Sequence, residues 1–220
     1  MDVIIVSKTH MTKAACVGGV LANGRLVRLL RSNGNNPDSD TELKVGDVYR
    51  ISFSERREIR PPHVEDILIN SMEYKFSFST IEKMVEYLTD KLKINIWRGS
   101  PEALFDRKLQ WTNGGSGYIP ESGEIPDNSV GFWIPDKDLI RNDYNEKVRY
   151  RYPIRRNIPF VGFQNPVNKI PAGTLVRVSL ARWWSKNEDE QRCYLQLSGW
   201  YGLPESEEET NDYDDDDLLF

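Results

Sequence analysis

The 220-residue sequence is poor in cysteine and histidine, the side chains that form disulfides and most often bind transition metals. It has 2 of each: Cys16 and Cys193 lie far apart and outside any Cys-x-x-Cys pattern, and His10 and His63 are also distant from one another. A structural zinc site needs about four such ligands at short spacings, so we expect no metal centre and no other cofactor. Two isolated thiols are typical of a reducing compartment, and we expect a cytoplasmic protein.

The sequence also lacks long apolar runs and the glycine-rich signatures of nucleotide-using enzymes. The apolar run at residues 3–6 is too short for the core of a signal peptide, and no segment approaches the length of a membrane span. A phosphate-binding loop, a nucleophile elbow and a dinucleotide fingerprint are absent. We therefore expect no membrane association, and we favour a binding protein over an enzyme.

Charge is abundant but unevenly placed along the chain. The formal net charge is −5, from 29 Lys and Arg and 34 Asp and Glu, yet nine of the acidic residues lie in residues 205–220, which hold no Lys or Arg. The rest of the chain therefore has 29 basic against 25 acidic residues, a net charge of +4. A mildly basic body with a separate acidic arm is typical of a polyanion-binding protein.

The acidic arm ends in an unusual way, with apolar residues behind a run of aspartates. So dense an acidic run repels itself, and we expect residues 204–220 to be a disordered tail. The ending resembles the C-terminal tip of bacterial single-stranded DNA-binding proteins, which implies that it recruits partner proteins and competes with DNA for the chain's own basic groove. The expected partner-binding residues are Asp214, Asp215, Asp216, Asp217, Leu218, Leu219 and Phe220.

Short strands dominate the first half of the sequence. Residues 2–7 form an apolar run typical of a buried strand, and residues 16–31 predict a hairpin that turns at Asn23-Gly24. The pair Gly18-Gly19 indicates a bulge or sharp coiling of the first hairpin strand. Residues 45–53 and 64–78 predict further strands. Ser79 and Glu82 form a capping box that starts a helix, and Ser100-Pro101 starts a second, shorter one.

The pattern as a whole predicts a mainly β protein with minor α structure. Short strands with glycine at bends, followed by a helix and then by more strands, favour two small antiparallel OB-like β-barrels with a short helical insertion, and a β-sandwich is the alternative. We place the N-terminal barrel and its helices at residues 1–112, a Gly/Pro-rich linker at 113–129, the C-terminal barrel at 130–203 and the acidic tail at 204–220.

The C-terminal hairpin has the clearest functional pattern. Residues 174–184 and 192–201 predict two strands, each with one apolar face and one face of cations, aromatic rings and hydrogen-bond donors. Single-stranded nucleic acid is bound by such a combination, because phosphates pair with Arg and bases stack on rings. With the Arg clusters elsewhere, the predicted nucleic-acid-binding residues are Arg28, Arg31, Arg60, Arg149, Arg151, Arg177, Arg182, Trp183, Trp184, Arg192, Tyr194, Gln196 and Trp200.

Two other functions remain open. His63, Glu65 and Asp66 follow the pair Pro61-Pro62 closely enough to act as a base and metal ligands, so a nucleotide- or nucleic-acid-processing enzyme, or a nucleotide sensor, is the first alternative. One histidine and two carboxylates without a nucleophile or a second ligand set are a weak pattern. The second alternative is a protein-interaction adaptor whose Trp-rich face binds a partner chain.

Several segments together resemble a bacterial family described as dual OB-containing domain proteins. They are Val6-Ser-Lys-Thr-His10, Cys16-Val-Gly-Gly19, Pro61-Pro-His-Val-Glu-Asp66, Phe160-Val-Gly-Phe-Gln164, Val178-Ser-Leu-Ala-Arg-Trp-Trp184 and Leu195-Gln-Leu-Ser-Gly-Trp-Tyr201. The resemblance extends over nearly all of residues 1–203 and implies two OB-like barrels. It implies no catalytic residues. We therefore predict a single-stranded nucleic-acid-binding protein, with DNA favoured over RNA and an unassigned oligomeric state.

Overall fold

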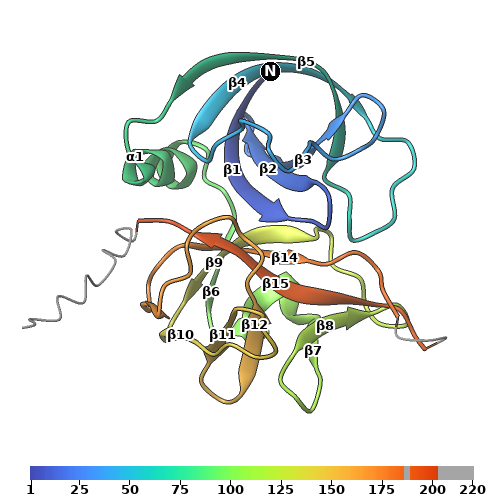
Figure 1. The fold of residues 1–220 in the computed structure, drawn as a ribbon, viewed down its shortest axis with the longest axis vertical. Coiled ribbons are helices and arrows are strands. Elements are labelled where there is room, and N and C mark those ends of the chain that lie inside the picture. Colours follow the sequence, from blue (N-terminus) through green and yellow to red (C-terminus); the bar gives the residue numbers. More distant parts are fainter. Residues whose placement is uncertain (186–188, 203–220) are drawn as a thin grey trace, which may run out of the picture.

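A computed structural model describes residues 1–185 and 189–202, and its first unit is a closed five-stranded barrel (Figure 1). The barrel order is β1-β2-β3-β5-β4, in which β3 and β5 run parallel and the other neighbours are antiparallel. The strands are β1 (Asp2–His10), β2 (Ala15–Leu21), β3 (Leu26–Arg31), β4 (Asp47–Glu55) and β5 (Asp66–Ser77).

Strand β1 is buried on both of its faces, which explains its uninterrupted apolar sequence. Val3 and Ile5 point into the barrel, whereas Ile4 and Val6 pack outside it, against the helix and the second unit. Burial of one aliphatic side chain stabilises a fold by about 1.5–3 kcal/mol, so this strand stabilises the barrel and its contact with the second unit together.

The hairpin between β2 and β3 turns where the sequence predicts. Gly24 has a φ of 84°, which only glycine adopts without strain, and its N–H donates to the carbonyl of Leu21. The predicted bulge is present beside the glycine pair, but on the other strand. Ile5 pairs with Gly19 and Ser7 pairs with Gly18, so the extra residue is Val6 of β1.

A short helical segment connects the barrel to the second unit. Helix α1 (Ile81–Glu86) continues into the π-turn η1 (Tyr87–Lys91), and the N-cap is Thr80, one residue after the predicted Ser79. Met84 and Leu88 are buried between the barrel and the second unit. The helix therefore packs in the seam between the two units (Figure 1).

The second unit has two sheets around one core. The larger sheet has the order β6-β9-β14-β15-β8-β7 and the smaller one β12-β11-β10-β13. The larger sheet comprises β6 (Ile96–Gly99), β7 (Gln110–Trp111), β8 (Gly117–Pro120), β9 (Val130–Pro135), β14 (Val176–Leu180) and β15 (Arg192–Trp200). The smaller comprises β10 (Leu139–Arg141), β11 (Arg149–Tyr152), β12 (Arg156–Pro159) and β13 (Lys169–Ile170). The 3-10 helix η2 (Pro101–Arg107) starts at Ser100, as predicted.

The mainly β fold is confirmed, as a closed barrel followed by a half-barrel. The chain leaves the first barrel at the end of β5, and β6, β7 and β8 all pair within the larger sheet of the second unit. The segment placed at residues 113–129 as a linker thus contains β8, and its glycines and prolines lie in the turns around that strand.

A β-bulge near the end of β15 changes which side chains reach the surface. Arg177 of β14 pairs with Gly199 and Val178 pairs with Leu197, so one extra residue interrupts the alternation of faces. Beyond the bulge, Trp200 turns into the core, where it is 4% exposed and packs against Tyr150 and Phe160. The expectation that Trp200 shares the exposed face with Tyr194 is therefore wrong.

Candidate nucleic-acid interface

The two units meet around two buried carboxylates, Asp66 and Glu65. Asp66, at the start of β5, is 2% exposed and forms ion pairs with Arg28 and Arg56 of the first unit and with Arg182 of the second. Burial by itself raises the pKa of the Asp66 carboxyl, but Arg28 and Arg182 reverse this effect and hold the pKa below its ordinary value. Asp66 therefore stays ionised and ties the two units together.

The neighbouring residues of the proposed enzyme segment are buried in the same contact. Glu65 is 2% exposed and accepts hydrogen bonds from the backbone N–H and hydroxyl of Ser129, the latter at 2.7 Å. His63 is 1% exposed, with its Nε2 3.6 Å from the thiol sulfur of Cys193. Burial, together with Arg182 and Arg28, lowers the pKa of His63 to about 3. This histidine is neutral at physiological pH.

These contacts give His63, Glu65 and Asp66 a structural role between the two units. Within residues 1–185 and 189–202, no three His, Cys, Asp or Glu side chains are grouped so that they would hold a metal ion. The two carboxylates that the enzyme alternative would use are bound by Ser129 and by arginines. Both cysteines are free thiols, Cys16 half-buried and Cys193 buried.

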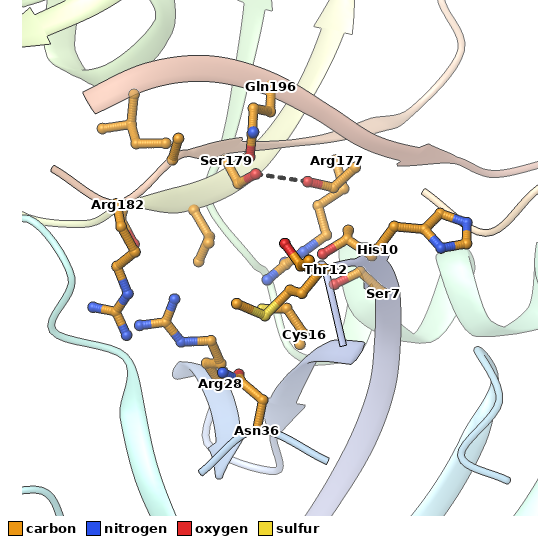
Figure 2. A pocket seen from close by; sticks show the side chains of 18 residues that line it. Ser7, His10, Thr12, Cys16, Arg28, Asn36, Arg177, Ser179, Arg182 and Gln196 are labelled. Carbon is orange, nitrogen blue, oxygen red and sulfur yellow. Dashed lines mark hydrogen bonds between the residues drawn. The ribbon is translucent and has the colours of Figure 1, made fainter. Parts of the chain in front are cut away.

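Beside this contact lies a cavity of about 320 Å³, here called the inter-unit pocket. The outer faces of β1, β2 and β3 form one wall, and β14, β15 and the residues before β9 form the other. Figure 2 shows Arg28, Arg177 and Arg182 directing their guanidinium groups toward the same space. None of the described residues that line it is a carboxylate; polar lining residues include Ser7, Thr12, Cys16, Ser129, Ser179, Gln196 and Ser198.

Arg177 is the most unusual residue of this pocket. Its side chain is 2% exposed, it forms no ion pair among the described residues, and its Nη1 has no hydrogen-bond partner there. The guanidinium carbon lies 5.3 Å from the ring centre of Phe132. Gly18 makes room for it, because a Cβ at that position would lie 2.7 Å from Nη2. Burial lowers the pKa of Arg177, yet an arginine remains charged in proteins.

A second cluster lies on the same sheet and is open to solvent. The ring centre of Tyr194 lies 6.3 Å from that of Trp184 and 5.9 Å from that of Tyr118. The guanidinium carbon of Arg192 lies 4.3 Å from the centre of the Tyr118 ring. Trp184 is 54% exposed. We call these four residues, Tyr118, Trp184, Arg192 and Tyr194, the aromatic platform.

Trp183 and Arg60 lie between the two units at the edge of the platform. The guanidinium of Arg60 lies 5.1 Å from the centre of the Trp183 ring, and Trp183 Nε1 donates to the carbonyl of Pro61 at 2.8 Å. Arg60 also pairs with Glu121. A cation and a ring from different units are thus held face to face.

The structure brings only part of the predicted set together. Arg28, Arg177, Arg182 and Gln196 line the inter-unit pocket, and Trp184, Arg192 and Tyr194 form the platform. Arg31 instead pairs with Asp38 on the first barrel, while Arg149 stacks on Tyr144 and Arg151 is exposed on the smaller sheet. The acidic tail at 204–220 lies outside the described residues.

Tyr118 belongs to the platform but was not among the predicted residues. It lies on β8, within the segment whose glycine and proline content indicated a linker. The alternation of Tyr118 with the buried Ile119 was the available signal for a short strand.

Comparison with known proteins is consistent with this architecture. A family model described as the dual OB-containing domain matches residues 1–200. The chain belongs to the dual OB-containing domain family. No curated protein and no solved structure matches it. In the part of the chain that the structure describes, no helix is long and apolar enough to cross a membrane.

Proposed function

We propose that this dual-OB chain binds single-stranded nucleic acid, DNA in preference to RNA, along a path from the aromatic platform to the inter-unit pocket. The observation that supports it best is that the two sites are continuous. Tyr194 of the platform and Gln196 of the pocket are alternate residues on one face of β15. Opposite them, residues 181–184 stay hydrogen-bonded to β15 through Ala181 and Trp184.

The chemistry of this path fits a single strand better than a duplex. Bases stack on exposed rings, which contributes about 1–3 kcal/mol per base and requires that the base be unpaired. Trp184 and Tyr194 offer such rings, and Arg192 on the platform and Arg182 in the pocket are the cations available to contact phosphates. OB-folds commonly bind oligonucleotides, so the fold supports the same conclusion.

The test is fluorescence anisotropy with labelled single-stranded DNA, single-stranded RNA and duplex DNA at low and moderate salt. We expect the tightest binding to single-stranded DNA and a steep loss of affinity with salt, because phosphate contacts release counterions. Binding that ignores salt, or no binding to any strand, would contradict the proposal and favour the adaptor whose Trp-rich face binds a protein.

The acidic tail forms a separate part of the proposal. Residues 214–217 are four aspartates and 218–220 are apolar, which suits docking to a partner with a basic rim and an apolar pocket. We propose that the tail also competes for the basic path on its own chain. A variant ending at Pro204 should then bind single strands more tightly than the full chain, most clearly at low salt. Equal affinities would contradict the competition.

A further inference from the structure

The inter-unit pocket has more positive charge than its surroundings neutralise. Arg28, Arg177 and Arg182 line the pocket, and Arg56 lies behind it on Asp66; the carboxylates near these four arginines are Asp66 and Glu65. Two positive charges are therefore left over. Transfer of an unpaired charge out of water is so costly that buried charges are normally paired or bind an ion.

We propose that the inter-unit pocket binds a terminal phosphate, the phosphomonoester group of a nucleotide or of the end of a strand. A phosphomonoester has a charge between about −1.5 and −2 at neutral pH, which matches the excess of two. An internal phosphodiester has only one negative charge. Arg177 Nη1, buried and without a partner, supplies a donor that such a group would satisfy.

The depth of Arg177 also favours a terminal group. Arg177 is 2% exposed and lines the cavity of about 320 Å³, which has room for a phosphate and a sugar. A phosphate in the middle of a strand has chain on both sides, which hinders its approach to a buried guanidinium. The same walls also offer the hydroxyl groups of Ser7, Ser179 and Ser198. The hydroxyl oxygens of Ser179 and Ser198 are 2.8 Å apart.

Gly18 gives independent support that the site is built for this guanidinium. A Cβ there would lie 2.4 Å from the hydroxyl oxygen of Ser7 and 2.7 Å from Nη2 of Arg177. Any larger residue would displace both groups. A buried guanidinium behind a glycine, with serine hydroxyls on the same walls, offers several donors to an anion.

The inference rests in part on the proposed function, since one source of the phosphate is the end of a bound strand. The experiment therefore compares three ligands: a 5′-phosphorylated single strand, the same strand with a 5′-hydroxyl, and thymidine 5′-monophosphate. For the wild-type full chain we expect the phosphorylated strand to bind at least roughly ten-fold more tightly than the hydroxyl strand, because charge-assisted hydrogen bonds are gained.

Arg177→Met removes the charge and keeps the length of the side chain. We expect it to fold and to bind both strands with equal affinity, because replacement of a buried charge by an apolar group of similar size is often tolerated. Arg182→Gln, at a more exposed position of the same pocket, serves as a second variant and should reduce the ten-fold ratio. Arg50→Met is the matched control, since Arg50 pairs with Asp2 on the barrel surface and should leave the ratio unchanged.

Alkylation of Cys16 gives a readout that needs no variant. Cys16 lines the pocket and is half-buried, whereas Cys193 is buried. The phosphorylated ligands should slow alkylation of Cys16 and the hydroxyl strand should not. Protection and thermal stabilisation by the mononucleotide without any strand binding would support the pocket and contradict the proposed function. Equal binding of the two strands with no effect of the mononucleotide would overturn the pocket inference and leave the proposed function standing.

Discussion

The arginines of the inter-unit pocket outnumber the carboxylates near them, whereas on the aromatic platform the guanidinium of Arg192 lies 4.3 Å from the centre of the half-buried Tyr118 ring. Arg177 is 2% exposed and Trp184 is 54% exposed. The guanidinium of Arg192 has a carboxylate, Glu190, within 4.0 Å, whereas Arg177 forms no ion pair among the described residues. The pocket holds a desolvated cation whose cost to folding a ligand would offset.

We infer from this difference that arginines and aromatic residues have two separate roles in this protein, one in ligand binding and one in folding stability. Platform residues sit at the surface, so their replacement should change affinity and leave folding stability alone. Residues that form ion pairs across the two units, above all Asp66, hold the units together, so their replacement should change stability first. Each prediction below would sharpen or break this division.

The largest expected effect is on stability, from Asp66→Asn. Loss of this carboxylate leaves Arg28 buried without its partner and removes the ion pair with Arg182 across the units. Loss of one partner of a buried pair costs about 3–5 kcal/mol of unfolding free energy. Urea denaturation of the variant and the wild type measures this loss of unfolding free energy. Glu55→Gln, which breaks the exposed pair with Arg25, is the control and should cost at most about 1 kcal/mol.

His63 should make the protein sensitive to mild acid. The unfolded chain binds a proton at this side chain below its ordinary pKa of 6.5, whereas the folded chain does so only near pH 3. The contribution of His63 to the free energy of unfolding is therefore full above pH 6.5 and falls as the pH drops. The loss is at most about 1.4 kcal/mol per pH unit, which gives about 2–3 kcal/mol by pH 4.5.

His63→Gln should flatten this pH dependence between pH 6.5 and 4.5. Asp66 does not account for the slope, because its folded pKa lies below the ordinary value of 3.8 and its contribution is lost only at lower pH. Thermal unfolding at a series of pH values tests the prediction. An unchanged slope in the variant would assign the acid sensitivity to other groups.

On the platform, Trp184→Ala should weaken binding to single-stranded DNA with little change in melting temperature. The loss of one stacked base corresponds to about 1–3 kcal/mol, or roughly 5- to 150-fold in affinity. Tyr74→Ala, at a ring on β5 that is 55% exposed, is the matched control. Equal losses for the two variants, or a large fall in the stability of Trp184→Ala, would break the division between platform and seam.

The smallest effect is expected for Arg192→Gln. If this guanidinium contacts a phosphate, the variant should reduce the slope of log affinity against log salt by about one and weaken binding to all sequences alike. Arg31→Gln, which removes a cation paired with Asp38 on the barrel, should leave the slope unchanged. If the salt slope changes in the Arg31→Gln variant and not in the Arg192→Gln variant, the strand lies on the first barrel instead.

Local patterns predicted much of the fold. The turn at Gly24, the strand β1 and the start of the helix at Ser100 follow from residue types whose backbone preferences act over a few positions. The dual-barrel class follows from the order of such elements. Alternation along β15 predicted correctly that Tyr194 and Gln196 share a face.

The site itself depends on contacts between distant segments, which no local pattern specifies. Alternation placed Trp200 on the surface, but a bulge of one residue turns it into the core. In the sequence, Glu65 and Asp66 resemble catalytic carboxylates. Only the folded contact shows that Glu65 accepts a hydrogen bond from Ser129 and that Asp66 pairs with Arg182. The buried, unpaired state of Arg177 depends on Gly18, far away in sequence.

Photo-crosslinking tests most directly the claim that one strand runs from the platform to the inter-unit pocket. A 5′-phosphorylated single strand with 4-thiothymidine at one position at a time is irradiated with the full chain, and the attached peptides are identified by mass spectrometry. We predict that the first nucleotide attaches to peptides containing Cys16 or Arg177 and later ones to peptides containing Trp184 or Tyr194. Attachment of every position to the surfaces around Arg31 or Arg149 would contradict the account.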